Sequence, residues 1–95
     1  MALSMLIEDM WQVPENGACI QGRVLDGKLR IGSGISIPTV YGPLMRTVVK
    51  IVNHRKEIIQ ADSLTGTVQI TIRPVEPRQI ETIKRGHLIE LINGE

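Results

Sequence analysis

The chain has 95 residues, a formal net charge of +1 and 42% hydrophobic residues. This length allows one domain with a modest core, and the near-neutral charge gives no general attraction to nucleic acid or to an anionic membrane. Ile, Val and Thr account for 28 residues, whereas Ala occurs three times. Because β-branched side chains favour strands over helices, the composition predicts a single all-β domain over residues 1–95.

Several classes of protein are excluded by what the sequence lacks. Cys19 is the single cysteine, so a disulfide-stapled secreted scaffold is excluded. No run of 18 apolar residues is present, and the N-terminus has no basic segment before an apolar one. We therefore expect a cytoplasmic protein without a membrane partner. Trp11 and Tyr41 are the only aromatic residues, which argues against a base-stacking platform of aromatic side chains.

The first half of the chain alternates short apolar segments with strong turn signals. An apolar segment over 3–13 ends at Pro14-Glu15-Asn16-Gly17, and Asp26-Gly27 predicts a hairpin between the next two strands. Pro38 is expected to end a strand that begins at Ile35, and a loop through Tyr41-Gly42-Pro43 follows. Along the whole chain, alternation predicts further strands over 18–25, 28–31, 35–37, 45–54, 58–60, 67–73 and 87–92.

The longest alternating stretch, 45–54, decides which basic side chains face solvent. Its odd-numbered residues are the more apolar set, so they are expected to face the core and to leave Arg46, Lys50 and His54 pointing outward. The expected interior positions across the chain are Ile20, Val24, Val49, Ile51, Val68, Ile70, Ile72 and Leu88.

One helical turn is predicted near 77–84. Glu76 is placed to cap it, Pro77 occupies the favoured first position, and Gly86 is expected to end it. Seven or eight short strands predict a closed barrel or a sandwich. We favour a small closed antiparallel β-barrel, because one short helical turn can seal a barrel end.

No constellation of residues indicates an enzyme, a metal site or a cofactor. His54, His87 and Cys19 are widely separated and lack the paired spacing of metal ligands. Glu8 and Asp9 are adjacent and would point to opposite faces of a strand. The run Gly32-Ser33-Gly34 is not followed by a helix, so it does not predict a phosphate-binding loop. No catalytic residue, metal, cofactor or nucleotide is therefore expected.

A basic cluster is the one positive signal for binding. The interval 45–56 has no acidic residue and contains Arg46, Lys50, Arg55 and Lys56. On a strand that rises about 3.3 Å per residue, Arg46 and Lys50 would share one face about 13 Å apart. Such a row could follow a phosphate backbone, or it could be a solvated face that discourages edge pairing. The candidate residues for contact with RNA or a partner are Arg46, Lys50, Arg55, Lys56, Arg23 and His54.

Six short motifs in order resemble the second, β-barrel domain of elongation factor Tu and related translational GTPases. They cover nearly the whole chain, from about residue 5 to residue 91. They are the run 7–11 with Gly17, the run 22–24 with Gly27, the segments 29–32 and 35–37, the segment 53–58, the acid and glycine of Asp62 and Gly66 before Val68, and the closing segment 83–88. The resemblance implies a closed antiparallel barrel in which Gly22 and Gly32 allow tight bending.

The sequence also differs from this family at positions that matter for function. No nucleotide-binding motif is present, so GTP hydrolysis is not implied. In elongation factor Tu this barrel helps to hold the aminoacylated end of tRNA with an acidic residue just before the Arg-Lys pair, and this sequence has Val52 there. Asn16 replaces the arginine of the family's Gly-Arg-Gly turn, and the loop over 73–84 is a few residues longer.

Two functions follow as hypotheses. The first is a non-enzymatic binding module that contacts RNA or a ribosome-associated partner through the basic residues. The second is a protein-interaction or assembly module without a nucleic-acid role, which would use an exposed strand edge or the apolar end at Leu44-Met45. A steep fall of affinity with salt would favour the first.

Overall fold

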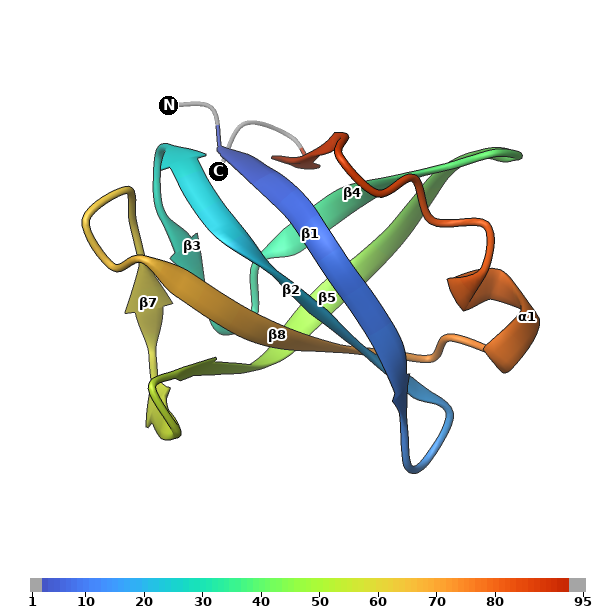
Figure 1. Ribbon diagram of the computed structural model, residues 1–95, viewed down its shortest axis with the longest axis horizontal. Coiled ribbons are helices and arrows are strands. Elements are labelled where there is room, and N and C mark those ends of the chain that lie inside the picture. The colour runs from blue at the N-terminus through green and yellow to red at the C-terminus, as the bar shows by residue number, and fades with distance from the viewer. Residues whose placement is uncertain (1–2, 93–95) are drawn as a thin grey trace.

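The computed structural model describes residues 3–92, and they form a closed antiparallel β-barrel with one short helix, α1 (Pro77–Ile80) (Figure 1). Six strands close the barrel in the order β4-β9-β1-β2-β8-β5, and β5 pairs back with β4. Their bounds are β1 (Ser4–Val13), β2 (Gly17–Asp26), β4 (Gly34–Thr39), β5 (Gly42–Asn53), β8 (Thr67–Arg73) and β9 (Leu88–Leu91). The predicted all-β barrel is confirmed.

The remaining strands are short and lie outside this ring. The strand β6 (Lys56–Ile58) extends the sheet from β5, and β3 (Leu29–Arg30) pairs with β7 (Gln60–Ala61). The hairpin predicted at Asp26-Gly27 is therefore wrong, because the strand after the turn does not pair with the strand before it. The strand β3 pairs instead with β7, Leu29 with Ala61 and Arg30 with Gln60. Most of β2 lies between β1 and β8, although its pairing with β8 ends at Arg23.

The core follows the predicted alternation where the strands are regular. Val68, Ile70 and Ile72 on β8 are fully buried. The alternate residues of the strand, Thr67, Gln69, Thr71 and Arg73, are half-buried. On β2, Ile20 and Val24 are buried, as predicted. These strands give the barrel interior its aliphatic filling, which is the main favourable contribution to its stability.

On β5 the prediction fails in the first half, because the strand contains a β-bulge. The pairing with β8 shifts between Val48 and Lys50, so Val49 has no partner there. Before the bulge the even-numbered residues face inward and Val48 is buried, whereas after it Ile51 is buried. Val49 is 42% exposed, and its predicted place in the core is wrong. An extra residue in one strand reverses the faces of everything on one side of it.

The last strand is also displaced by one residue from its predicted register. Ile89 is buried and Leu88 is 41% exposed, so the predicted interior position of Leu88 is wrong. Leu88 and Ile89 are both apolar, and the pairing of Met5 with Ile89 decides which of the two side chains faces the interior. A run of apolar residues gives no period that could distinguish the two registers.

The β4–β5 hairpin replaces the loop that the sequence predicted. Pro38 does not end β4 but lies within it opposite Pro43, and Thr39 pairs with Gly42 across a two-residue turn. The Pro38 carbonyl still accepts a hydrogen bond of 3.0 Å from the Lys84 N–H. Proline is tolerated in a strand where its missing N–H is not needed by a neighbour.

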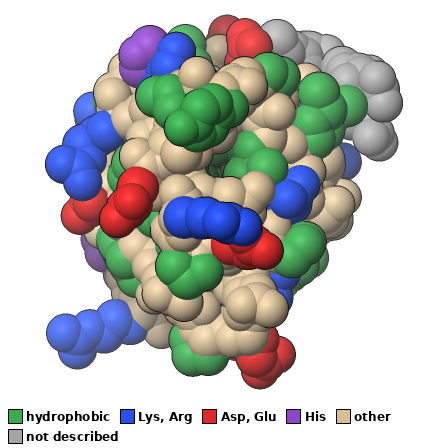
Figure 2. Space-filling view, turned by 90° about the vertical axis from the view of Figure 1, so that its right-hand side faces the viewer, with side chains coloured by type: hydrophobic (Ala, Val, Ile, Leu, Met, Phe, Trp, Pro, Cys, Tyr) green, Lys and Arg blue, Asp and Glu red, His purple; other side chains and the backbone are tan. Residues whose placement is uncertain are grey.

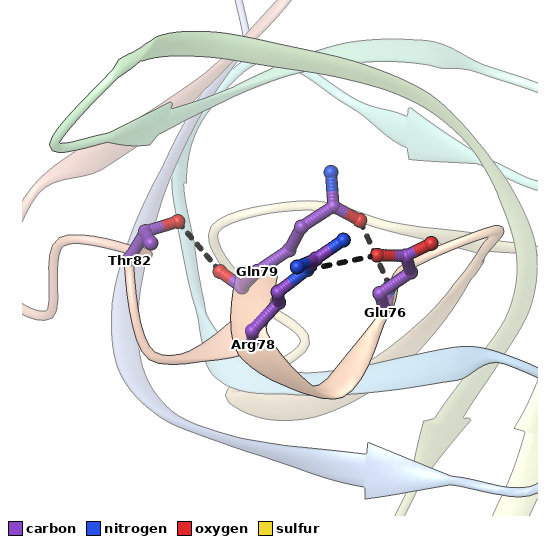
Figure 3. A network of polar contacts seen from close by, with 4 residues as sticks. All are labelled: Glu76, Arg78, Gln79 and Thr82. Atoms are coloured by element: carbon purple, nitrogen blue, oxygen red, sulfur yellow. Dashed lines mark hydrogen bonds and ion pairs between the residues drawn. The ribbon is translucent and has the colours of Figure 1, made fainter.

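The helical turn begins where the sequence placed it but ends earlier. Glu76 is the N-cap, and its N–H donates to the Gln79 side-chain oxygen at 2.8 Å (Figure 3). The Thr82 hydroxyl donates to the Gln79 carbonyl. Because the chain leaves the helical conformation after Ile80, Gly86 does not end α1, and it lies with a φ of 84° in the turn before β9.

Gly22 lies at a close approach between the backbones of β1 and β2. A Cβ at this position would lie 1.9 Å from the carbonyl oxygen of Leu6, beside a shift in the β1–β2 pairing between Ile7 and Asp9. Gly32 has no close neighbour, and its φ of 91° is what favours glycine there. Gly22 thus allows β1 and β2 to approach closely, and Gly32 adopts, in the turn between β3 and β4, a backbone conformation that favours glycine.

Candidate functional site

The outward surface of β1, β2, β8 and β5 is the candidate site, and we call it the outer face. Strand pairing places its side chains in two adjacent rows across the sheet. One row runs Trp11–Cys19–Thr71–Lys50, and the next runs Asp9–Gln21–Gln69–Val52. The Gln69 amide nitrogen donates to the Gln21 side-chain oxygen at 3.3 Å. The first row thus has an aromatic residue at one end and a lysine at the other, and polar side chains lie between them and in the second row.

The bulge in β5 separates two residues that the sequence placed together. Lys50 is exposed on the outer face, as predicted. Arg46 lies before the bulge on the side of Val48 and is half-buried, and its guanidinium donates to the carbonyl oxygens of Pro74 and Met45. The predicted outward row of Arg46 and Lys50 is therefore wrong, because the two side chains lie on different faces of β5.

The predicted residues 54–56 form the turn at the end of β5. His54 and Arg55 are its two central residues, with φ values of 50° and 67°, and they are exposed. Positive φ at both positions is the geometry of a two-residue hairpin turn that matches strand twist. Lys56 begins β6 and is also exposed, so three of the predicted residues are brought together, beyond the Val52 row.

Arg23 lies on the outer face one row beyond Gln21, opposite Thr67. Its guanidinium forms an ion pair of 3.1 Å with Glu8, and both side chains are partly exposed. Asp9 is paired in the same way with Arg85 at 3.0 Å. Each of the two acidic residues, Glu8 and Asp9, is thus paired with an arginine, and the Arg23 guanidinium is already engaged by Glu8.

Sequence reasoning missed Trp11 and Arg73 as members of this surface. Trp11 is 39% exposed at one end of the first row. Arg73 follows Thr71 by two residues and packs against Gly17, and its Nη2 donates to the Pro14 carbonyl at 3.2 Å. The Arg73 Nε is buried and has no hydrogen-bond partner. The alternation of 67–73, which the sequence shows clearly, was the signal that could have placed Arg73 here.

The outer face holds its cysteine as a neutral thiol. Burial raises the pKa of Cys19 from its ordinary value of 9.0 to about 11, because a thiolate would lose its hydration, and the nearby Lys50 ammonium opposes this in part. A thiol with a raised pKa is a poor nucleophile at neutral pH. In this environment Cys19 packs as a small hydrophobic residue.

Among residues 3–92, no three His, Cys, Asp or Glu side chains are grouped as metal ligands would be. Within the same part of the chain, no helix has the length and apolar character needed to cross a membrane.

Comparison with known proteins defines the class of fold. The barrel has the fold of the second, β-barrel domain of translational GTPases of the elongation factor Tu type. Among solved structures, the chain is similar to the translation elongation factor SelB from Methanococcus maripaludis in its apo form, with a TM-score of 0.78 and 17% sequence identity. The match covers 100% of this chain and 20% of that protein, so the chain spans about a fifth of its length. No protein-family model and no curated protein matches the sequence.

Proposed function

We propose that this barrel is a non-enzymatic binding module of translation that contacts RNA in the cytoplasm through its outer face. The observation that carries the proposal is the fold, since the barrel resembles a translation-factor domain that is not itself catalytic. Fold alone does not fix function, so the outer face must supply the chemistry.

The charges of the outer face support an RNA ligand. Lys50 lies at one end of a row and Arg73 at the end of the neighbouring strand, while the turn at residues 54–56 adds Arg55 and Lys56. Cationic side chains along one surface favour contact with phosphates. Trp11 lies at the far end of the Lys50 row, where its partly exposed ring offers a stacking surface for one base.

Position 52 argues against one specific form of RNA binding. Val52 is half-buried beside Gln69 in the second row, where the family has an acidic residue. An aliphatic side chain cannot accept a hydrogen bond from a ribose hydroxyl. We therefore propose recognition of RNA mainly through phosphate contacts, without specific capture of an aminoacylated tRNA end.

The test compares two single-lysine variants of the whole chain. Lys50→Ala removes a charge from the outer face, and Lys84→Ala removes an exposed lysine from the segment that pairs with Pro38. Affinity for a short labelled single-stranded RNA is measured at several salt concentrations. The slope of log affinity against log salt should decrease by about 0.7 for Lys50→Ala and stay unchanged for Lys84→Ala.

A wild-type barrel with no salt-sensitive affinity for RNA would remove the RNA proposal and leave the protein-interaction hypothesis. Equal effects of the two lysine variants would instead show attraction that does not involve the outer face. Both variants change solvent-exposed side chains, so their stability should stay within about 0.5 kcal/mol of the wild type.

A further inference from the structure

A short stretch of β5 has an unpaired edge. The β4 strand pairs with β5 from Gly42 to Thr47, but on the other edge of β5 the pairing with β8 begins only at Thr47. The segment Gly42–Arg46 therefore has a strand on one edge only. An unpaired strand edge presents backbone donors and acceptors to any extended chain that can reach them.

The direction of each backbone group follows from the hydrogen bonds nearby. The Val48 N–H donates to the Ser33 carbonyl at 3.0 Å, and the Val48 carbonyl accepts from Gly32 N–H at 2.8 Å. The register between β4 and β5 has no shift from Gly42 to Thr47. The backbone N–H and carbonyl groups of the even-numbered residues in this part of β5 therefore point toward β4. The Met45 N–H and the Pro43 carbonyl, on odd-numbered residues, therefore point toward the free edge.

These two groups have no backbone partner among residues 3–92. The Met45 carbonyl, in contrast, accepts a hydrogen bond of 2.7 Å from Arg46 Nη1. Proline has no N–H, so position 43 offers only its carbonyl. The free edge consequently offers one acceptor and one donor, two residues apart, which is the spacing that a single added strand would satisfy.

A hollow lies against this edge and gives an added strand room for its side chains. Its volume is about 520 Å³, within the range of about 300–1,000 Å³ that is usual for ligand sites. It is bounded on one side by the hairpin, from Thr39 to Leu44, and on the other by α1 and the residues after it. Figure 2 shows this side of the barrel, where hydrophobic side chains gather above a band of charged ones.

The lining of the hollow combines apolar contact with free side-chain donors. Tyr41 is 88% exposed at the hairpin tip, and Leu44 is half-buried at the base. The oxygen of the Gln79 side chain is used by the Glu76 N–H, while its amide nitrogen points away from the helical turn (Figure 3). The Arg78 Nε is paired with Glu76 at 3.2 Å, and the side chain is largely exposed.

We propose that an extended peptide from a partner protein adds to the free edge of β5 as a short strand. One peptide N–H donates to the Pro43 carbonyl, and one peptide carbonyl accepts from the Met45 N–H. An apolar peptide side chain packs on Tyr41 and Leu44 in the hollow, where the Gln79 amide nitrogen is placed to bond a further carbonyl. This is recognition by strand addition, in which the main chain supplies affinity and the hollow supplies selectivity.

A single peptide fits this edge better than a second copy of the barrel or a nucleic acid. If two barrels paired through this edge about a two-fold axis at Leu44, Tyr41 in the turn of one copy would lie opposite Thr47 of the other. That position is not free, because Thr47 already pairs with Arg73 of β8. A nucleic acid would meet no net positive charge, because Glu76 and Glu81 lie beside Arg78 around the hollow. A peptide needs only the two backbone groups and the apolar lining.

The first experiment uses a phage-displayed library of random linear peptides selected against the whole chain. In the free protein, the Met45 amide should exchange its hydrogen quickly, while the amides of Leu44 and Arg46 are protected. A selected peptide, made synthetically, should slow the exchange of Met45. Slow exchange of Met45 before any peptide is added, or selected peptides that leave it unchanged, would overturn the proposal.

The second experiment removes single hydrogen bonds. Methylating each peptide nitrogen in turn should weaken binding by about two- to thirteenfold at one position, since one backbone hydrogen bond contributes about 0.5–1.5 kcal/mol. Met45→Pro should give a similar loss, and Met45→Ala, which keeps the N–H, is its matched control. If Met45→Pro fails to fold, the methylated peptides still decide the question. Equal affinity for every methylated peptide would contradict strand addition.

This inference goes beyond the proposed RNA contact and stands apart from it. The free edge is on the α1 side of the barrel, and the residues that define it are not those of the outer face. Lys50→Ala should therefore leave peptide affinity unchanged, and Met45→Ala should leave RNA affinity unchanged. Peptides whose binding is lost in Lys50→Ala would bind the outer face and would contradict the assignment to the β5 edge.

Discussion

The neighbouring strands β5 and β8 are both rich in β-branched residues, yet one follows its sequence pattern and the other does not. In β8 each inward residue is buried from Val68 to Ile72. In β5 the pattern reverses at Val49, and the reversal turns Arg46 away from the outer face while keeping Lys50 on it. A regular strand can thus be assigned to its two faces from sequence, whereas a bulged strand needs its partner.

Single-residue deletions should separate the two strands most strongly. Deleting Thr71 shifts Ile72 outward and brings Arg73 toward the interior, which should abolish cooperative folding of a domain whose total stability is about 5–15 kcal/mol. Deleting Val49 removes the residue without a partner and should cost only about 1 kcal/mol. Urea unfolding followed by circular dichroism measures both. A Val49 deletion as damaging as the Thr71 deletion would show that the bulge is needed for folding.

Substitutions within β5 test the same reversal without changing chain length. Ile51→Ala removes a fully buried side chain and should cost about 2–5 kcal/mol. Val49→Ala changes an exposed one and should cost less than about 0.5 kcal/mol. Equal losses in thermal or urea unfolding would place both side chains in the core and exclude the bulge.

Gly22→Ala tests the other irregular pairing in the barrel. A new methyl group would lie 1.9 Å from the Leu6 carbonyl oxygen, so the backbone of β1 or β2 must move. We expect a loss of about 3 kcal/mol, at the upper end of the usual cost of overpacking. Gly34→Ala is the control, since its Cβ would meet only the Ile92 side chain at 3.6 Å. A stability change for Gly22→Ala no larger than that of the control would contradict the close approach.

The smallest expected effect concerns the titration of Cys19. Its folded pKa of about 11 lies above the ordinary 9.0, so the folded state holds the proton more tightly. The corresponding stability is fully present below pH 9 and is lost as the pH rises toward 11. Replacing Cys19 with Ala should therefore flatten the fall of stability between pH 9 and 11 relative to wild type. The same slope in both proteins would show that another group controls this range.

Lys50→Ala should raise the pKa of Cys19 further, because the ammonium group favours the thiolate. Arg46→Ala should leave the Cys19 pKa unchanged, because Arg46 bonds the carbonyls of Pro74 and Met45 instead. Thiolate absorbance against pH measures both variants. A pKa that responds to Arg46→Ala and not to Lys50→Ala would reverse the assignment of faces in β5.

The sequence by itself determined the fold class, the regular strands and the start of α1. The abundance of Ile, Val and Thr favours strands, the alternation of 67–73 assigns that strand's faces, and Glu76-Pro77 marks the helical start. These features depend on each segment's own period and on local backbone chemistry, so neighbours are not needed to assign them.

Only the tertiary structure decided the bulge at Val49, the register of β9 and the membership of the outer face. Val48 and Val49, like Leu88 and Ile89, are apolar pairs, so either member could face the core until the partner strand fixes which one does. Trp11 and Lys50 are 39 positions apart in sequence, and they occupy the two ends of one row because Cys19 of β2 and Thr71 of β8 pair between them. Pairing across a closed barrel is a property of the whole sheet, and it sets which side chains share a surface.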